Sequence, residues 1–281
     1  MLCLEAKIAL KTFLLGLCIF LSIEFGNIYL NCVSLTENAM TISSATAVLC
    51  FVVGLLYRGY NFQIGIRAAL LGAIFALGFY VRVVTPPNIQ IFGTYMCIMA
   101  FFHFSEFFFI ALIQPKQVST DSFVINHSPQ YIIAAVTSWL EFFLECYFFP
   151  GLKQIYWLSN VGLCICVLGE LLRKASMLTA RSNFHHLVQC EKSNDHILVT
   201  HGVYAWFRHP SYVGWFYWSI GTQIILLNPL CVPAYAIASW HFFKTRIYIE
   251  EITLLNFFGQ SYCDYQQKVS TGLPFIKGYK I

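Results

Sequence analysis

Residues 91–113 decide the class of this protein, because they read IFGTYMCIMAFFHFSEFFFIALI with a single charged side chain, Glu106. A helix that crosses a bilayer needs about 20 predominantly apolar residues. The whole chain has the same character, since 58% of its 281 residues are hydrophobic and only 11% are charged. A soluble domain carries about 25% charged residues, so a cytosolic globular protein is excluded. The net charge of +4 is also too small and too scattered for a nucleic-acid-binding protein.

Apolar runs on both sides of this segment predict an all-α, polytopic membrane protein with about eight transmembrane helices. The predicted spans are 8–30, 41–57, 66–84, 91–113, 130–149, 155–172, 212–227 and 229–243. The last two are short and are joined by the turn signal Asn228-Pro229. At 1.5 Å per residue, we expect this pair to be a hairpin that barely spans the bilayer or stops short of it.

The positions of Lys and Arg indicate how the chain is oriented. Eight spans place both termini on one face of the membrane, and 15 of the 17 Lys and Arg residues fall on that face. Only Arg82 and Lys153 fall on the other face. Because cytoplasmic loops carry the excess of positive charge, we expect both termini in the cytosol. The chain is expected to form a single integral membrane domain, residues 1–281, with soluble parts at 173–211 and 244–281.

Polar residues that could carry chemistry concentrate in those two soluble parts. Five of the eight histidines lie between residues 185 and 209, and the tail adds Arg246, Glu250 and Glu251. These residues either form a polar site in the cytosol or are simply the solvated parts of the protein, and composition favours neither interpretation. The acids inside the predicted spans, Glu24, Glu106, Glu141 and Glu145, are more typical of helix packing than of an ion path, because they form no regular ladder.

Two common kinds of cofactor site are not expected. The spacing HxxxxH of His196 and His201 and the doublet His185-His186 could hold a metal, but no third histidine box follows and no CxxC pair occurs. A metal site is therefore not predicted. No GxG occurs in the chain either, so a cofactor would have to be held without a glycine-rich loop.

Two stretches of the soluble parts are the most informative. Residues 202–214, GVYAWFRHPSYVG, place Pro210 in the first turn of a helix that enters the membrane. Such a helix start offers backbone N–H groups to an anion, although it could equally be an interfacial belt of aromatic residues. Residues 244–259, KTRIYIEEITLLNFFG, predict a helix ended by Gly259, with Arg246 and Glu250 on one face. That pair is either an exposed ion pair or a cation and an acceptor directed into one site.

Together these stretches resemble the isoprenylcysteine carboxyl methyltransferase family in its eukaryotic, eight-helix form. The resemblance is dense over residues 155–281 and looser over 1–150, so 155–281 would form the catalytic methyltransferase core and 1–150 the N-terminal helices. The motifs that carry it are Gly169-Glu170-x-Leu172-Arg173-Lys174 through Ser182-Asn183-Phe184, Arg208-His209-Pro210-Ser211-Tyr212-Val213-Gly214, Arg246-x-x-x-Glu250-Glu251, Phe258-Gly259-x-x-Tyr262 and Thr271-Gly272-Leu273-Pro274-Phe275-Ile276.

The resemblance implies a methyl transfer from S-adenosylmethionine to the C-terminal carboxylate of a farnesylated or geranylgeranylated cysteine. The products would be a methyl ester and S-adenosylhomocysteine, in the last step of CaaX processing. Partners would be prenylated CaaX proteins such as Ras-type small GTPases. The enzyme would reside in the endoplasmic reticulum membrane, with a C-terminal cofactor-binding region and active site facing the cytosol.

The resemblance also implies roles for individual residues. Arg246 would hold the substrate carboxylate, and Arg173 would be needed for activity, although Arg173 could also be a snorkelling cation at a helix end. The cofactor contacts would be Gln189, His196, Ile197, Leu198, Val199, Tyr204, His209, Pro210, Ser211, Tyr212 and Glu250.

Elementary chemistry agrees with these roles. A C-terminal carboxylate has a reference pKa of about 3.3–3.7 and is ionised at pH 7, so no general base is required. An arginine fork suits it because it can bind a carboxylate bidentately. The competing interpretations are a membrane reductase that uses a nicotinamide cofactor and a transporter, although the inverted repeats typical of transporters are not apparent.

Overall fold

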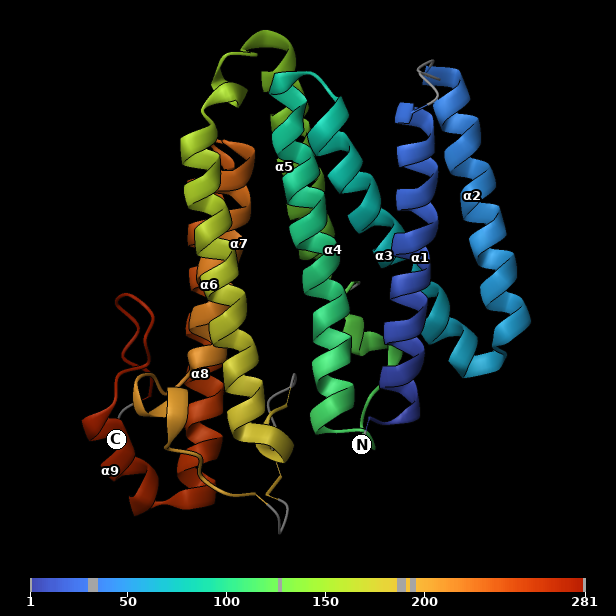
Figure 1. Cartoon of the computed structure of the whole chain (residues 1–281). Coiled ribbons are helices and arrows are strands. Elements are labelled where there is room, and N and C mark those ends of the chain that lie inside the picture. Colours follow the sequence, from blue (N-terminus) through green and yellow to red (C-terminus); the bar gives the residue numbers. More distant parts are fainter. Residues whose placement is uncertain (1, 30–34, 126–127, 186–190, 193–195, 280–281) are drawn as a thin grey trace. The chain divides into compact units, whose positions relative to one another are not determined.

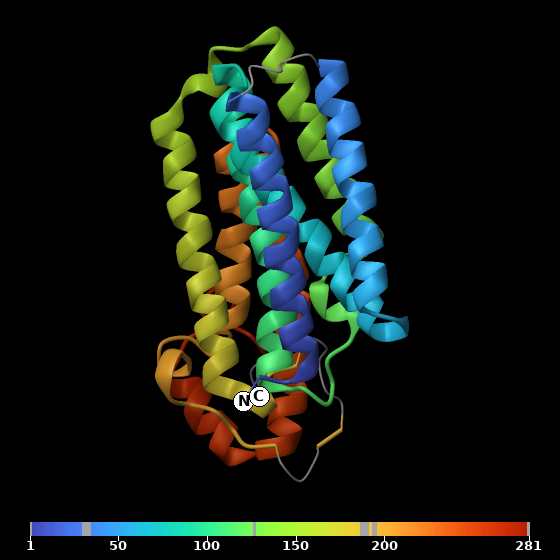
Figure 2. The same ribbon diagram turned by 45° about the vertical axis from the view of Figure 1, so that its right-hand side comes forward.

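The computed structural model of the chain describes residues 2–29, 35–125, 128–185, 191–192 and 196–279, without the side chains of 27–29 and 35–39. Within these residues every regular element is a helix (Figure 1). The chain divides into two compact units, Met1–Tyr156 and Trp157–Ile281, which are considered one at a time. Long helices dominate both units, as Figure 2 shows from a second direction. The prediction of an all-helical chain is confirmed.

The first unit consists mainly of long helices. They are α1 (Leu4–Tyr29), α2 (Leu35–Leu56), α3 (Gly59–Val84), α4 (Pro87–Ile113) and α5 (Pro129–Phe148), with the short 3₁₀ helices η1 (Thr120–Phe123) and η2 (Leu152–Gln154). Prolines open two of them, because the ring of Pro87 or Pro129 fits the first helical turn. The side chain of Ser128 caps α5 by accepting a hydrogen bond from the backbone N–H of Tyr131 at 3.3 Å.

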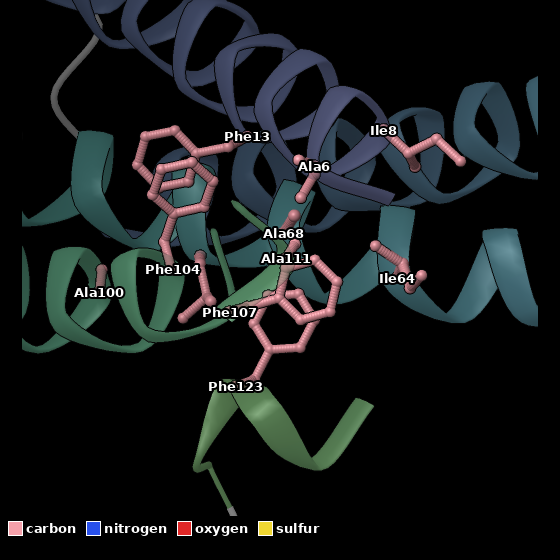
Figure 3. Packing of buried hydrophobic residues seen from close by; sticks show 12 residues of the cluster. Ala6, Ile8, Phe13, Ile64, Ala68, Ala100, Phe104, Phe107, Ala111 and Phe123 are labelled. Carbon is pink, nitrogen blue, oxygen red and sulfur yellow. The ribbon is translucent and has the colours of Figure 1, made fainter. Parts of the chain in front are cut away.

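Close backbone contact and aromatic stacking hold α1, α3 and α4 together. A Cβ atom on Gly16 of α1 would collide with the carbonyl of Ala69, and one on Gly72 of α3 would collide with that of Phe13. Glycine at these points lets the helices approach closely, as is typical of helix packing in membranes. Figure 3 shows the adjoining aromatic cluster, in which Phe13 stacks on Phe104 with ring centroids 4.0 Å apart. This unit is therefore held mainly by apolar contacts.

The second unit carries the motifs that resemble the methyltransferase family. Its elements are α6 (Tyr156–Ala180), η3 (Arg181–Asn183), η4 (Gly202–Ala205), α7 (Pro210–Leu226), α8 (Cys231–Phe258) and α9 (Gln260–Lys268). Helices α6 and α7 also meet at glycines, because a Cβ on Gly214 would collide with the carbonyl of Gly169. This contact brings the last turns of α6 against the first turns of α7.

One sequence prediction is corrected by α8. The segments 229–243 and 244–259, predicted as a membrane span and a separate tail helix, form a single helix, Cys231–Phe258. No glycine or proline lies between residues 234 and 258 to interrupt it, so the helix continues past the end of the apolar run. It ends where predicted, at Gly259, whose φ of +53° suits glycine.

In the part of the chain that the structure describes, four helices have the length and the apolar composition needed to cross a membrane. They are Leu4–Gly26, Gly59–Val84, Pro87–Ile113 and Pro129–Phe148, and Met40–Leu56 is a shorter apolar helix. The helices begin up to seven residues before the predicted spans, because an apolar count misses polar first turns such as Gly59-Tyr60-Asn61. A membrane protein with several crossings is confirmed. The count of eight and the single membrane domain stay predictions.

Candidate active site

An open pocket in the second unit collects side chains from α7, α8 and the loop that follows α6. It offers about 510 Å³ of empty space, part of it continuous with solvent. The residues that line it are Asn183, His185, His196, Ile197, Tyr212, Glu250, Thr253, Leu254, Phe257 and Phe258. The pocket therefore combines a carboxylate with several aromatic faces.

The Arg208-His209-Pro210 turn is fixed beside this pocket by the start of α7. Pro210 occupies the first helical position, and His209 is the residue before the helix. The backbone N–H of Arg208 donates to the carbonyl of Ser270 at 2.8 Å, so the C-terminal segment pairs with the turn. The side chains of Arg208 and His209 are both buried, which requires partners for their polar atoms.

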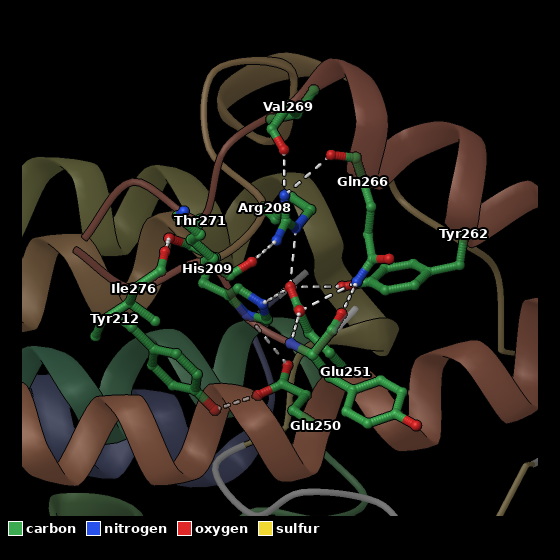
Figure 4. A network of polar contacts seen from close by, with 12 residues as sticks. Arg208, His209, Tyr212, Glu250, Glu251, Tyr262, Gln266, Val269, Thr271 and Ile276 are labelled. Atoms are coloured by element: carbon green, nitrogen blue, oxygen red, sulfur yellow. Dashed lines mark hydrogen bonds and ion pairs between the residues drawn. The ribbon is translucent and has the colours of Figure 1, made fainter. Parts of the chain in front are cut away.

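Glu251, whose side chain is fully buried, is the common acceptor of this turn and the C-terminal segment (Figure 4). Its Oε1 accepts from Nε of Arg208 at 2.8 Å, Nε2 of His209 at 3.1 Å and the hydroxyl of Tyr262 at 3.2 Å. Its Oε2 accepts from Nε2 of Gln266 at 3.1 Å and from the backbone N–H of Tyr279 at 2.8 Å. Five donors therefore converge on one carboxylate.

The pKa of Glu251 reflects two opposing effects. Burial raises the pKa of a carboxyl group, but the hydrogen bonds and charges of His209 and Arg208 outweigh burial, and the pKa lies below its usual value. The pKa of Tyr262 is raised, first by burial and then by the charge of Glu251. Glu251 is thus an ionised acceptor, while Tyr262 keeps its proton and donates.

Arg208 also binds the C-terminal segment, through contacts with its backbone carbonyls. It donates to the carbonyl of Lys277 at 3.0 Å and to that of Gln266 at 3.3 Å, and it also contacts the carbonyl of Val269. Gly278, at φ +77°, passes so close to Glu251 that a Cβ atom there would overlap the carboxylate. The segment 266–279 is therefore built onto the Arg208–Glu251 pair.

Tyr212, Glu250 and Arg246 form a second polar group at the pocket. The Tyr212 hydroxyl donates to Oε2 of Glu250 at 2.5 Å and accepts from Nε of Arg246 at 3.0 Å. The His209 ring stacks on the Tyr212 ring with centroids 5.6 Å apart and planes 5° apart. Helix periodicity explains the arrangement on α8, since Arg246 and Glu250 are one turn apart and face the same side.

Arg173 is placed by the glycine contact between α6 and α7. Its side chain is almost fully buried, and it donates to Oγ of Ser211 at 2.6 Å. Its guanidinium lies 4.5 Å from the ring centroid of Trp215, within the range of a cation–π interaction. Burial of this kind is not what a snorkelling cation shows, since such a cation keeps its head in water.

The residues assigned to the cofactor by resemblance fall into separate groups. His196, Ile197, Tyr212 and Glu250 line the pocket. Another group lies away from the lining: His209, Pro210 and Ser211 are buried at the start of α7, and Leu198 packs near Leu255, Tyr262 and Tyr265. The carbonyl of Tyr204 accepts from the Tyr265 hydroxyl at 2.5 Å, and Val199 is partly buried. Gln189 lies outside the described residues. Their roles, like those of Arg173 and Arg246, stay predictions.

Several lining residues were missed as site residues by sequence reasoning. Leu254, Phe257 and Phe258 follow Glu250 by four, seven and eight positions, so the helical period of α8 could have found them. Asn183 and His185 follow no such period; the sequence showed them only within a family motif and a histidine cluster. Among the described residues, no cluster of three His, Cys, Asp or Glu side chains is arranged to hold a metal.

Known proteins match this chain over its whole length. The protein-S-isoprenylcysteine O-methyltransferase of Tribolium castaneum is 65% identical over 275 residues, 98% of each chain. The human protein of the same name is 50% identical over 277 residues, 99% of this chain and 95% of the human one. A solved structure of a eukaryotic intramembrane Ras methyltransferase has a TM-score of 0.98 and 64% identity, covering 99% of this chain and 100% of that chain.

The match to a family profile falls on the second unit. Residues 161–256 match the isoprenylcysteine carboxyl methyltransferase family, and this range contains all the residues that line the pocket except Phe257 and Phe258. Taken with the full-length relatives, the match shows that this chain belongs to the isoprenylcysteine carboxyl methyltransferase family.

Proposed function

We propose that this enzyme transfers a methyl group from S-adenosylmethionine to the C-terminal carboxylate of a prenylated cysteine in CaaX-processed proteins, such as Ras-type small GTPases. Membership of the family makes it a methyltransferase, and the cofactor and substrate are the proposed part. We propose that it works in the endoplasmic reticulum membrane, with both termini and the pocket facing the cytosol, and that residues 155–281 carry the catalytic function.

One observation carries the proposal: Arg246 and Glu250 meet on the hydroxyl of Tyr212 at the pocket. Arg246 is a cation that can bind a carboxylate, and Glu250 is an acceptor that can bind a cationic ligand. The Tyr212 side chain links the two. This is the arrangement needed to bring an anionic methyl acceptor against a positively charged methyl donor.

The lining of the pocket fits S-adenosylmethionine, which when bound supplies a methyl group on a positively charged sulfur. Glu250 provides a negative charge, and the faces of Tyr212 and Phe257 provide surfaces that attract a cation or stack on a flat heterocycle. The His196 ring lies near both His185 and Phe257, with centroids 5.6 and 5.8 Å away. An aromatic wall therefore runs along one side of the pocket.

The residues have a positioning task rather than a proton-transfer task. The substrate carboxylate is already ionised at pH 7, so neither His209 nor Glu250 is needed as a general base. Arg246 can grip the carboxylate through its guanidinium fork, and Tyr212 fixes the orientation of Arg246. Holding the two reacting groups in line is an effect that can contribute several kcal/mol to catalysis.

Binding calorimetry on the full chain in lipid nanodiscs tests the proposal. We expect S-adenosylmethionine to bind and NADPH not to bind, and we expect Glu250→Gln to weaken S-adenosylmethionine binding. Binding of NADPH without S-adenosylmethionine would instead favour a nicotinamide-dependent reductase and contradict the proposal.

A further inference from the structure

Asn183 stands at the junction of two walls of the pocket. It ends η3, the short turn that follows α6, where Arg181 adopts a positive φ of +48°. The next residue, Phe184, is buried, and the Arg173 guanidinium lies 5.9 Å from its ring centroid. Asn183 is therefore anchored to α6 on one side and to a buried aromatic residue on the other.

The side chain of Asn183 reaches across to a segment that lies 14 positions further along the chain. Its Oδ1 accepts a hydrogen bond from the backbone N–H of Ile197 at 2.8 Å. Its Nδ2 makes a longer contact with the carbonyl of Ala180, at 3.5 Å. One short polar bond thus ties the end of α6 to the strip 196–199.

The strip 196–199 needs such a tie because it forms neither helix nor strand. Its two flanking contacts come from side chains: the His196 ring lies near Phe257, and Leu198 packs near the cluster of Leu255, Tyr262 and Tyr265. Both Asn183 and Ile197 line the pocket. The bond between them consequently fixes the backbone of one wall relative to the other.

We propose that Asn183 is a positioning residue for the methyl donor, because its Oδ1 holds the backbone of Ile197 in the conformation that binds the donor. The inference rests on the proposed function of the pocket and names a residue that helps to shape it. A loop that is ordered before the ligand arrives loses less conformational entropy on binding, so its affinity is higher. The bond affects the affinity for the methyl donor. It does not affect the affinity for the substrate carboxylate, which Arg246 binds.

The test compares Asn183→Ala with Asn183→Asp in the full chain in nanodiscs. Aspartate keeps an acceptor oxygen at the same reach, whereas alanine removes it. Asn160→Ala, at an exposed position on the preceding helix α6, serves as the matched control. Measured quantities are the Kd for S-adenosylmethionine, the KM of a farnesylcysteine analogue, kcat at saturating donor, and hydrogen–deuterium exchange of the peptide containing Ile197.

We expect Asn183→Ala to raise the Kd for the donor about three- to tenfold, the usual effect of one hydrogen bond, and to speed exchange at residues 196–199. The KM of the farnesylcysteine analogue and kcat should stay within about twofold, and Asn183→Asp and Asn160→Ala should retain donor affinity. An unchanged Kd in Asn183→Ala, or an equal loss in Asn183→Asp, would overturn the proposal.

If Asn183→Ala fails to fold, exchange in the wild-type protein decides the matter, since a rapidly exchanging Ile197 amide would contradict the bond itself. Failure of the wild-type protein to bind S-adenosylmethionine would instead contradict the proposed function, so the two failures can be told apart.

Discussion

The two units of this chain differ in the contacts that hold their buried cores together. In the first unit, residues 1–156, helices pack through glycine contacts and stacked rings such as Phe13–Phe104. In the second unit, residues 157–281, the buried core contains a charged network centred on Arg208 and Glu251. Buried charge is costly unless fully paired. The first unit also buries charged side chains, among them Lys153 and Glu106, but the carboxylate on which five donors converge lies in the unit that carries the pocket and matches the family profile.

The substitution that we expect to have the largest effect removes Arg208 from the charged network. Arg208→Leu should reduce the free energy of unfolding by about 3–5 kcal/mol, because it leaves the carboxylate of Glu251 buried without its cation. Chemical denaturation in detergent micelles would measure the loss. Lys153→Leu in the first unit is the matched comparison, since its partner Glu145 is partly exposed at 15%, and it should cost less. Equal losses in the two variants would remove the contrast between the units.

The second prediction concerns the rate of methyl transfer and not the stability of the fold. Arg246→Ala should lower methyl transfer to a farnesylcysteine analogue about 100-fold, an effect of the size expected for a misplaced reactant, while donor affinity is largely retained. A labelled-methyl assay combined with calorimetry would measure both. Lys244→Ala, two residues away and exposed, is the control and should remain active. Normal turnover in Arg246→Ala would remove its proposed role.

A third experiment uses the glycine contacts that occur within each of the two units. Gly72→Ala in α3 and Gly214→Ala in α7 each force a methyl group against a backbone carbonyl, which should cost about 1–3 kcal/mol of stability. Only Gly214→Ala should also weaken activity, because it displaces the start of α7 and the Ser211–Arg173 bond. The control is Gly26→Ala, where a Cβ meets nothing within 4 Å. A loss of specific activity in Gly72→Ala comparable to that in Gly214→Ala would contradict the division of roles.

The smallest effect is the pH dependence due to Glu251. Its folded pKa lies below its unfolded value, which is about 4.3, so its stabilising contribution is complete above that value and is lost as the pH falls through the folded pKa. Glu251→Gln removes this titration. Melting temperatures measured from about pH 6 down to about pH 3 should therefore fall less steeply in the variant. Parallel curves for the two proteins would show that Glu251 does not contribute to acid sensitivity.

Sequence reasoning succeeded where the determinant is local. Apolar runs such as 91–113 found the long helices, and the four-residue spacing placed Arg246 and Glu250 on one face of α8. It could not assign Glu251 a role, because its donors Arg208, Tyr262, Gln266 and Tyr279 come from segments as much as 43 positions away. Asn183 was hidden for the same reason, since its bond to Ile197 depends on how the loop after α6 folds back.

The proposed function of the second unit depends most directly on the contact between Arg246 and the substrate carboxylate. The most direct measurement is competition by two farnesylcysteine analogues, one ending in a carboxylate and one in a neutral carboxamide, against the wild type and Arg246→Ala. We expect the wild type to prefer the carboxylate and the variant to bind both analogues alike. A variant that keeps the full preference for the carboxylate would contradict the account.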